Sequence, residues 1–225
     1  SPTLFSGGSR VLVDGKLTPN SLMRGAQVAA MGCLGTASVL ATAYDRPGAI
    51  VLAVIALLLL WAYSFKPVQA SYRGFGAFLQ TLGIAVVLPV FGFYVQAGTV
   101  RGFPWIPLLV LAVSQLSCAM ATALPDIDGD KKAGKNTLAV KLGHRGSQVF
   151  MAVLLLSASL LLWLSLDLTP GQIQPSWLGV PVVAAVFAGT IPKVHIGLHR
   201  MTAVAITTIA GALAIEVMYI FALFR

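Results

Sequence analysis

Seven long apolar runs divide this chain, and they constrain its fold more than any other feature of the sequence. They cover residues 25–44, 47–65, 74–100, 102–125, 146–166, 168–192 and 201–224, and the span within the sixth run begins near Trp177. Each run comes close to or exceeds the roughly 20 residues that a membrane-spanning helix needs. Apolar residues are continuous within the runs, whereas a porin-like barrel would show strict alternation. The sequence therefore predicts an all-α, polytopic transmembrane helical bundle with seven spans.

The composition agrees with a membrane protein. Of the 225 residues, 57% are hydrophobic and 10% are charged, and the mean hydropathy is +0.87. A soluble domain carries about 25% charged residues, and a chain this apolar could not cover its surface with polar groups. Water-soluble and disordered proteins are therefore excluded. Because no repeat or low-complexity segment divides the chain, residues 1–225 are expected to form a single transmembrane domain.

The basic residues indicate the orientation of the bundle. All but three of the fifteen Lys and Arg residues fall in the N-terminal segment or in the loops 66–73, 125–146 and 193–200. Such an excess of basic residues is typical of cytoplasmic loops. We therefore expect these loops in the cytoplasm of a multi-pass protein, in the cell membrane of a bacterium or archaeon. The net charge of +8 is explained by this bias, without a nucleic-acid partner.

Three of the seven acidic residues lie together where the fourth run ends: Asp126, Asp128 and Asp130. Carboxylates this close repel one another unless a cation neutralises them, and oxygen ligands suit Mg²⁺ or Ca²⁺. Asp126 and Asp130 are four residues apart, so on a helix they share a face. A calcium EF-hand loop does not fit, because Lys131 stands where glycine is required and Thr137 stands where glutamate is required.

Two interpretations of this acidic cluster stay open from the residues alone. In the first, the carboxylates hold a Mg²⁺ ion that bridges a substrate diphosphate, and Lys131, Lys132 and Lys135 add positive charge for the phosphates. In the second, the segment is a solvated loop of mixed charge. The position against a membrane helix, followed at once by lysines, favours the first interpretation.

Several short segments together resemble the UbiA-type intramembrane prenyltransferases. The stretch 126–143, which begins Asp-Ile-Asp-Gly-Asp, resembles the second aspartate-rich motif of that family. Residues 62–67 (Ala-Tyr-Ser-Phe-Lys-Pro) resemble its Tyr-Ser/Pro-x-x-Lys segment. Residues 6–18 resemble the stretch that follows its first aspartate-rich motif, and this stretch and residues 93–98 are most similar to the menaquinone-pathway branch.

The resemblance implies a fold of nine transmembrane helices, with the first aspartate-rich motif after the second helix. The seven predicted spans would then correspond to helices three to nine. On this interpretation the sequence lacks the two N-terminal helices and the first motif. The chain is then either a piece of a longer enzyme or an inactive, truncated homologue.

The resemblance also implies an activity. It is the Mg²⁺-dependent transfer of an isoprenyl chain from an allylic diphosphate to an aromatic acceptor within the lipid bilayer, in quinone biosynthesis. The favoured acceptor is 1,4-dihydroxy-2-naphthoate, on the menaquinone pathway, and homogentisate and 4-hydroxybenzoate remain possible. Asp126 and Asp130 would hold Mg²⁺, with Asp128 in support. The main alternative class is a transporter, but its acidic residues would be expected at mid-membrane.

Further site residues follow from the same resemblance. Tyr63 and Ser64 would lie near the reacting carbon, although Tyr63 could equally be an aromatic residue of the membrane interface. Lys66 would pair with the diphosphate or an acceptor carboxylate, or only flank the membrane. Arg10 and Arg73 are weaker candidates for the same task.

Two features inside the predicted spans involve polar residues. On the fourth span, Gln115, Thr122 and Asp126 fall on one helical face with Ala119, so this face is expected to line the cavity. Gln115 could instead serve helix–helix hydrogen bonding. Glu216 is the only acidic residue deep inside a predicted span, and we expect a paired or protonated structural residue there.

Overall fold

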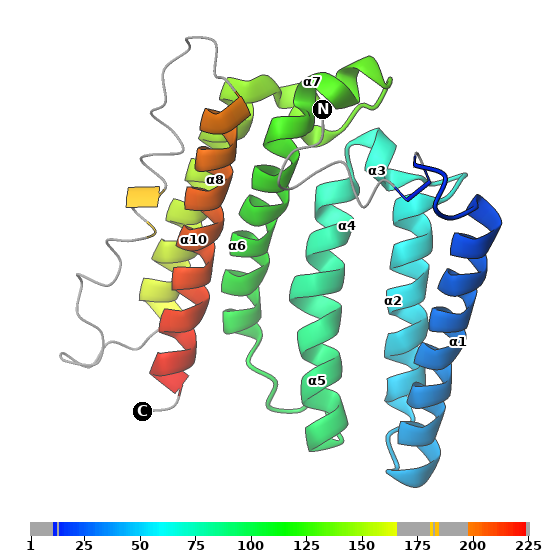
Figure 1. The fold of residues 1–225 in the computed structure, drawn as a ribbon. Helices are drawn as coiled ribbons and strands as arrows, with labels where there is room; N and C mark the ends of the chain where they lie inside the picture. The colour runs from blue at the N-terminus through cyan, green and yellow to red at the C-terminus, as the bar shows by residue number, and fades with distance from the viewer. Residues whose placement is uncertain (1–10, 13, 166–180, 182, 185–197, 224–225) are drawn as a thin grey trace.

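The computed structural model describes residues 11–12, 14–165, 181, 183–184 and 198–223, and this part of the chain contains helices and no β-strand. The long and medium helices run roughly side by side, and short helices lie at one end of them (Figure 1). The elements are α1 Pro19–Ala43, α2 Gly48–Ser64, α3 Ala70–Arg73, α4 Gly76–Leu82, a π-helical turn Gly83–Val87, α5 Leu88–Ala97, α6 Trp105–Ala123, a 3₁₀ turn Leu124–Asp126, α7 Ile127–Lys132, α8 Leu138–Ser165 and α10 Leu198–Leu223.

Four helical segments are long and apolar enough to cross a membrane, which is the pattern of an integral, multi-pass membrane protein. They are Pro19–Ala43, Gly76–Ala97, Trp105–Lys132 and Leu138–Leu164, and two shorter apolar helices cover Gly48–Ser64 and Met201–Val217. The predicted all-α class is confirmed for the described residues. The predicted sixth span, 168–192, lies almost wholly outside the described residues, so the number of seven spans stays a prediction.

Local sequence explains where these helices begin and bend. α1 begins six residues before the predicted span because Thr18 caps it: the Thr18 hydroxyl accepts a hydrogen bond from the Ser21 N–H at 3.1 Å, and Pro19 fills the first helical position. Between α4 and α5 the π-helical turn precedes Pro89, which has no N–H to donate to a helical ladder. α4 and α5 thus form one interrupted span.

The start of α8 differs from the prediction. The sequence placed a loop over 125–146, because charged residues interrupt the apolar pattern there, but the structure has α7 and the first turns of α8 within it. Gly143 breaks α8 with φ 66° and ψ 177°. The part beyond Gly143 begins close to the predicted residue 146. Charge lowered the hydropathy of this segment without preventing backbone helix formation.

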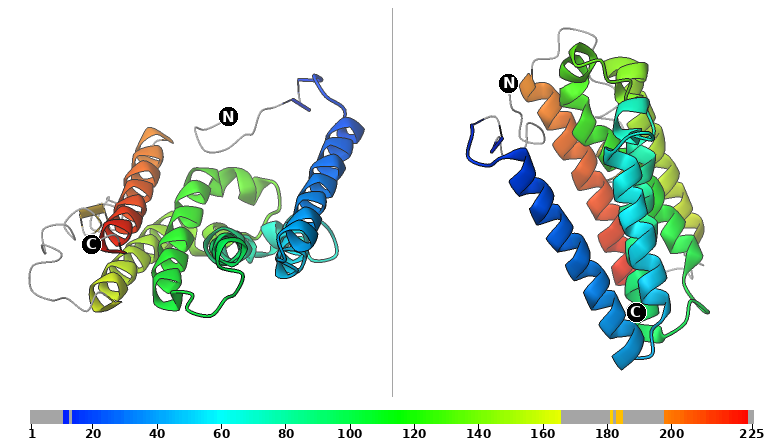
Figure 2. Two further views of the ribbon diagram at one scale, coloured as in Figure 1. Left: turned by 90° about the horizontal axis from the view of Figure 1, so that it is seen from below. Right: turned by 90° about the vertical axis from the view of Figure 1, so that its right-hand side faces the viewer.

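The helices pack as two groups that meet at α6. α8 and α10 lie on one side of α6, whereas the α4–α5 span, α2 and α1 follow in turn on the other side (Figures 1 and 2). The largest buried clusters lie between α6, α8 and α10, and they include the fully buried side chains of Met120, Met151 and Leu155. A smaller cluster around Ala37, Ala49 and Ala53 joins α1, α2 and α5.

Backbone contacts tie two loops together at the end of the bundle that carries α3 and α7, called here the α3–α7 end. The Asn136 N–H donates to the Tyr72 carbonyl at 2.9 Å, and the Lys141 ammonium donates to the Arg73 carbonyl at 3.4 Å. Gly74, with φ +94°, permits this approach, since a Cβ there would lie 2.9 Å from Lys141 Nζ. The loop after α7 is thereby held against α3.

Candidate active site

A cavity of about 250 Å³ opens at the α3–α7 end, between α2, α4, α6 and the segment that follows α6. Five residues singled out from the sequence line it: Tyr63, Thr122, Asp126, Asp130 and Lys135. Tyr63 lies on α2 and the other four within residues 122–135, and α4, which packs against both α2 and α6, brings these two stretches together. Polar and apolar side chains contribute about equally to the wall, so the cavity suits a ligand with both kinds of surface.

The two carboxylates of the cavity stand on consecutive turns. Pro125 ends the regular ladder of α6, a 3₁₀ turn carries Asp126, and α7 carries Asp130 one turn later. Both side chains line the cavity, as the i, i+4 spacing predicted. Asp128 points elsewhere: its side chain is 72% exposed and lies 3.8 Å from His144 Nε2. Its supporting role toward a metal stays a prediction.

Lys135 contributes a positive charge to the cavity, next to the two carboxylates. Its Nζ donates to Asp130 Oδ1 at 2.7 Å and lies 5.3 Å from the centre of the Tyr72 ring. The hydrogen bond to Asp130 raises the pKa of Lys135 above its ordinary value, against a smaller opposing effect of burial. The ammonium therefore stays charged at neutral pH, and it compensates one of the two carboxylates.

The structure adds residues that the sequence reasoning missed. Gln80 of α4 and the hydroxyls of Ser71 and Thr137 also line the cavity. The Ser71 hydroxyl donates to the Tyr63 carbonyl at 2.7 Å, which ties the end of α2 to α3. Gln80 carried a usable signal, because an amide inside an apolar span is expected to face the bundle interior. Ser71 and Thr137 carried none, since the sequence predicts loops of mixed polarity over both.

Other candidate residues do not line this cavity. Ser64, Lys66 and Arg73 are exposed at the same end of the bundle, Lys131 is exposed on α7, and Gln115 is partly buried on α6. Arg10 lies outside the described residues. The roles predicted for these six residues stay predictions.

Glu216 lines a separate, mostly apolar cavity of about 590 Å³ beside α5 and α6. Among the described residues, no cation lies within ion-pair distance of it. The sequence led us to expect a paired or a protonated residue, and the paired alternative is not seen in this part of the chain. The carboxyl faces Phe93, Phe103 and Leu108 instead, at a cavity distinct from that of Asp126.

The donor set of the first cavity fits a hard divalent cation. Asp126 and Asp130 supply carboxylate oxygens, and no cluster of three or more His, Cys, Asp or Glu side chains arranged for a metal exists among the described residues. Magnesium is commonly held by one or two carboxylates, with phosphate oxygens and water completing its shell. The two carboxylates of this cavity match that mode of magnesium binding. They do not form a closed cage of protein ligands around a metal.

The sequence matches a known protein family over most of its length. The profile described as "UbiA prenyltransferase family" matches residues 8–204 of the 225. The chain belongs to this family. The resemblance drawn from the aspartate-rich stretch 126–143 is therefore confirmed, and membership in the UbiA family argues against the transporter interpretation.

Two proteins that are similar in sequence to this chain carry the same name, 1,4-dihydroxy-2-naphthoate octaprenyltransferase. The one from Mycobacterium tuberculosis is 31% identical over 182 residues, which are 79% of this chain and 59% of that protein. The one from Bacillus subtilis is 25% identical over 99 residues, which are 44% of this chain and 32% of that protein. The chain thus spans less than two thirds of the length of either relative. No solved structure matches the chain.

Proposed function

We propose that the protein transfers an isoprenyl chain from an allylic diphosphate to an aromatic acceptor within the membrane, as a step of quinone biosynthesis. The observation that carries the proposal is the cavity that Asp126, Asp130 and Lys135 line together with Tyr63, in a chain of the UbiA family. Charged groups for a diphosphate and an aromatic ring for a cation-like carbon thus share the wall of one cavity.

The acceptor that we favour is 1,4-dihydroxy-2-naphthoate, on the menaquinone pathway. Its support is the name of the two relatives, together with the resemblance of residues 6–18 and 93–98 to that branch. Homogentisate and 4-hydroxybenzoate are the alternative acceptors. We also propose that the chain forms one domain of seven spans, equivalent to helices three to nine of a nine-helix fold, with loops 66–73, 125–146 and 193–200 in the cytoplasm.

We propose Mg²⁺ as the cofactor, held by Asp126 and Asp130 with Asp128 in support from outside the cavity. The chemistry that the ion supplies when bound is neutralisation of negative charge on the diphosphate. Within the chain itself, Asp130 orients Lys135, whose ammonium stands 2.7 Å from the carboxylate and can turn toward a phosphate oxygen. Lys66, Arg73, Lys131 and, from the N-terminal segment, Arg10 would attract the diphosphate to this end of the bundle.

The remaining residues act on the prenyl group and the acceptor. The Tyr63 ring forms part of the wall and can offer its π face to the carbon that becomes positively charged as the diphosphate leaves. Ser64, Thr122 and Gln115 are proposed to contact the acceptor or the diphosphate through their polar groups. Apolar walls, among them Ala119, Met120 and Leu138, keep water from that carbon.

The test uses the full-length protein in membranes or detergent with a radiolabelled prenyl diphosphate and each of the three acceptors. Transfer should require Mg²⁺ and should fall roughly 100-fold or more in Asp126→Asn and in Asp130→Asn. Asp45→Asn is a matched control, because Asp45 is exposed in the turn between α1 and α2 and its φ of 55° suits asparagine. Full activity of both site variants would refute the site, and a wild-type protein without transfer activity would favour an inactive homologue.

A further inference from the structure

One carboxyl group inside the bundle takes no part in the proposed reaction. Glu216 of α10 lines a cavity of about 590 Å³ between α5, the start of α6 and α10, called here the Glu216 cavity. These parts of the three helices lie at the end of the bundle opposite α3 and α7 (Figure 1). Along α6, Leu111 of the Glu216 cavity and Thr122 of the polar cavity are about 16 Å apart. The two cavities share none of their described lining residues, so they are separate sites.

We propose that the Glu216 cavity binds an apolar molecule that carries a protonated amine. The ammonium group lies against the Glu216 carboxylate, and the apolar body lies among the surrounding side chains. This assignment concerns neither the diphosphate nor the aromatic acceptor. It is therefore independent of the proposed function, and its test needs no prenyl transfer.

The charge of Glu216 has no compensating group in the part of the chain that the structure describes. None of the described residues that line its cavity is basic, and none of the described ion pairs includes it. The sequence carries no Lys, Arg or His between residues 166 and 192, where the sixth span is predicted. A charged side chain inside a membrane span is costly and normally has a partner. A cationic ligand supplies that partner.

The polar atoms that the Glu216 cavity offers are hydrogen-bond acceptors. Gln96 Nε2 already donates to the Gly92 carbonyl at 3.2 Å, which leaves Gln96 Oε1 as an acceptor without a partner among the described residues. Three lining residues are prolines, which have no N–H to donate: Pro89, Pro104 and Pro107. An ammonium group has only donors and a positive charge, so it matches this wall, whereas a phosphate or a carboxylate does not.

Aromatic rings complete the wall beside the carboxylate. The rings of Phe93 and Phe103 meet edge to face with their centroids 5.1 Å apart, and Phe103 also contacts Trp105 at 4.8 Å. These contacts hold the Phe103 ring between α5 and the start of α6. Aromatic faces attract organic cations, and the cavity volume lies within the roughly 300–1,000 Å³ that is common for small-molecule sites. The cavity therefore has room for both the ammonium and an apolar body.

The first experiment measures the Kd of 4-phenylbutylamine, which is protonated at neutral pH, by calorimetric titration of the full-length protein in lipid nanodiscs. Empty nanodiscs give the background from partition into lipid. The neutral 4-phenylbutan-1-ol has a similar shape and should bind at least about tenfold more weakly. Glu216→Gln should weaken binding of the amine about 10- to 100-fold. Asp45→Asn, at an exposed carboxylate in the turn between α1 and α2, should keep the wild-type Kd.

The second experiment tests the location and leaves Glu216 unchanged. Leu111 lines the Glu216 cavity, whereas Leu109, two residues away on α6, is 52% exposed and does not line it. Leu111→Trp puts a larger side chain into the space of the ligand and should weaken binding of the amine at least about tenfold. Leu109→Trp adds the same side chain outside the cavity and should keep the wild-type Kd.

Three outcomes would overturn the inference. They are no saturable binding of the amine beyond that of empty nanodiscs, equal binding of the amine and the alcohol, and an unchanged Kd in both Glu216→Gln and Leu111→Trp. None of them bears on the proposed function, which the transfer assay with the Asp126 and Asp130 variants tests separately.

Discussion

The two sides of this bundle differ sharply in how tightly they are packed. In the most apolar stretch of Trp105–Lys132, 39% of the residues are buried, and in that of Leu138–Leu164 the share is 44%. The corresponding share in α1 is 6%, where Ala37 is the buried residue. α6, α8 and α10 thus form a densely packed part of the bundle, called here the dense side. α1 and α2, in contrast, present much of their apolar surface outward.

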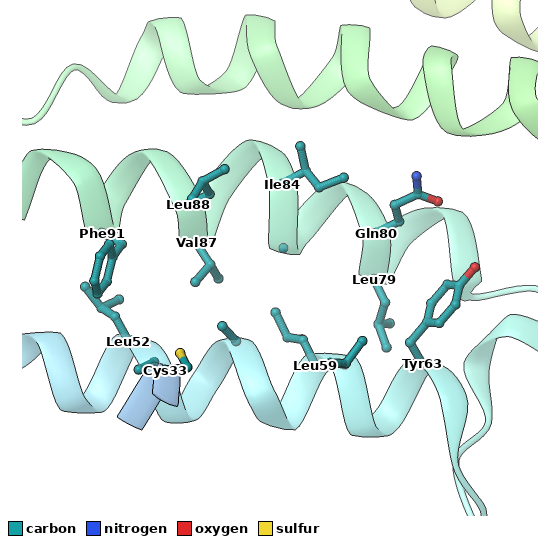
Figure 3. Close-up of a pocket in the computed structure, with 14 residues that line it drawn as sticks. Cys33, Leu52, Leu59, Tyr63, Leu79, Gln80, Ile84, Val87, Leu88 and Phe91 are labelled. Atoms are coloured by element: carbon teal, nitrogen blue, oxygen red, sulfur yellow. The ribbon is translucent and has the colours of Figure 1, made fainter. Parts of the chain in front are cut away.

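The proposed catalytic groups belong to the densely packed side. Asp126 and Asp130 follow directly from α6, a helix of the dense side, so their positions are fixed by close packing. Catalytic groups need such a fixed geometry. A separate cavity of about 620 Å³, lined almost wholly by apolar side chains, lies between the loosely packed α1, α2 and the α4–α5 span (Figure 3). The comparison leads to four predictions, ordered from the largest expected effect to the smallest.

The dense side should be far more sensitive to loss of a side chain. Leu155→Ala, at a fully buried position of α8 facing the α6–α10 cluster, should lower the free energy of unfolding by about 2–5 kcal/mol. Val28→Ala on α1, where the side chain is 64% exposed, should change it by less than about 0.5 kcal/mol. Unfolding in mixed micelles measures both. Equal effects would show that the packing contrast does not control stability.

The charged end of the dense side should depend on Lys135. Lys135→Met removes the ammonium that pairs with Asp130, and kcat/KM should fall about 10- to 100-fold, which corresponds to a charged hydrogen bond of 1.5–3 kcal/mol. Lys135→Arg keeps the charge and should recover part of the activity. If Lys135→Met kept the wild-type kcat/KM, the pair would have no part in the reaction.

The close approach of α2 and α5, where the Gly48 N–H donates to the Tyr94 hydroxyl at 2.8 Å, should be sensitive to one added methyl group. Gly48→Ala would place a Cβ against the Tyr94 ring and should cost roughly 1–3 kcal/mol of stability, through overpacking. Gly92→Ala on the facing helix is a control, because a Cβ there meets nothing within 4 Å. The free energies of unfolding of the two variants should differ clearly, and a Gly48 variant as stable as the Gly92 variant would show that α2 and α5 are not closely joined there.

The smallest effect is expected at the exposed start of α1. Thr18→Ala removes the hydroxyl that accepts the Ser21 N–H, and the helix cap should lose about 1 kcal/mol. Hydrogen exchange should become faster in the first turn of α1 and stay unchanged in α6. Faster exchange throughout the bundle would mean that α1 is coupled to the dense side more strongly than its burial indicates.

Local patterns in the sequence predicted most of the helices and part of the site. The apolar runs located α2 to within a residue at either end, and the i, i+4 spacing placed Asp126 and Asp130 on one face. Hydropathy failed where charge and helix occur together, at α7 and at the start of α8, because backbone hydrogen bonds form regardless of side-chain charge.

The sequence by itself determined the membrane class, the helical spans among the described residues and the carboxylate pair, since these depend on residues close together in the chain. The tertiary structure decided which distant side chains share a cavity. Gln80 and Tyr63 line the same polar cavity from different helices, and the Asn136–Tyr72 hydrogen bond holds the segment that carries Lys135 against α3. Such contacts arise from the packing of helices whose order in space no local periodicity encodes.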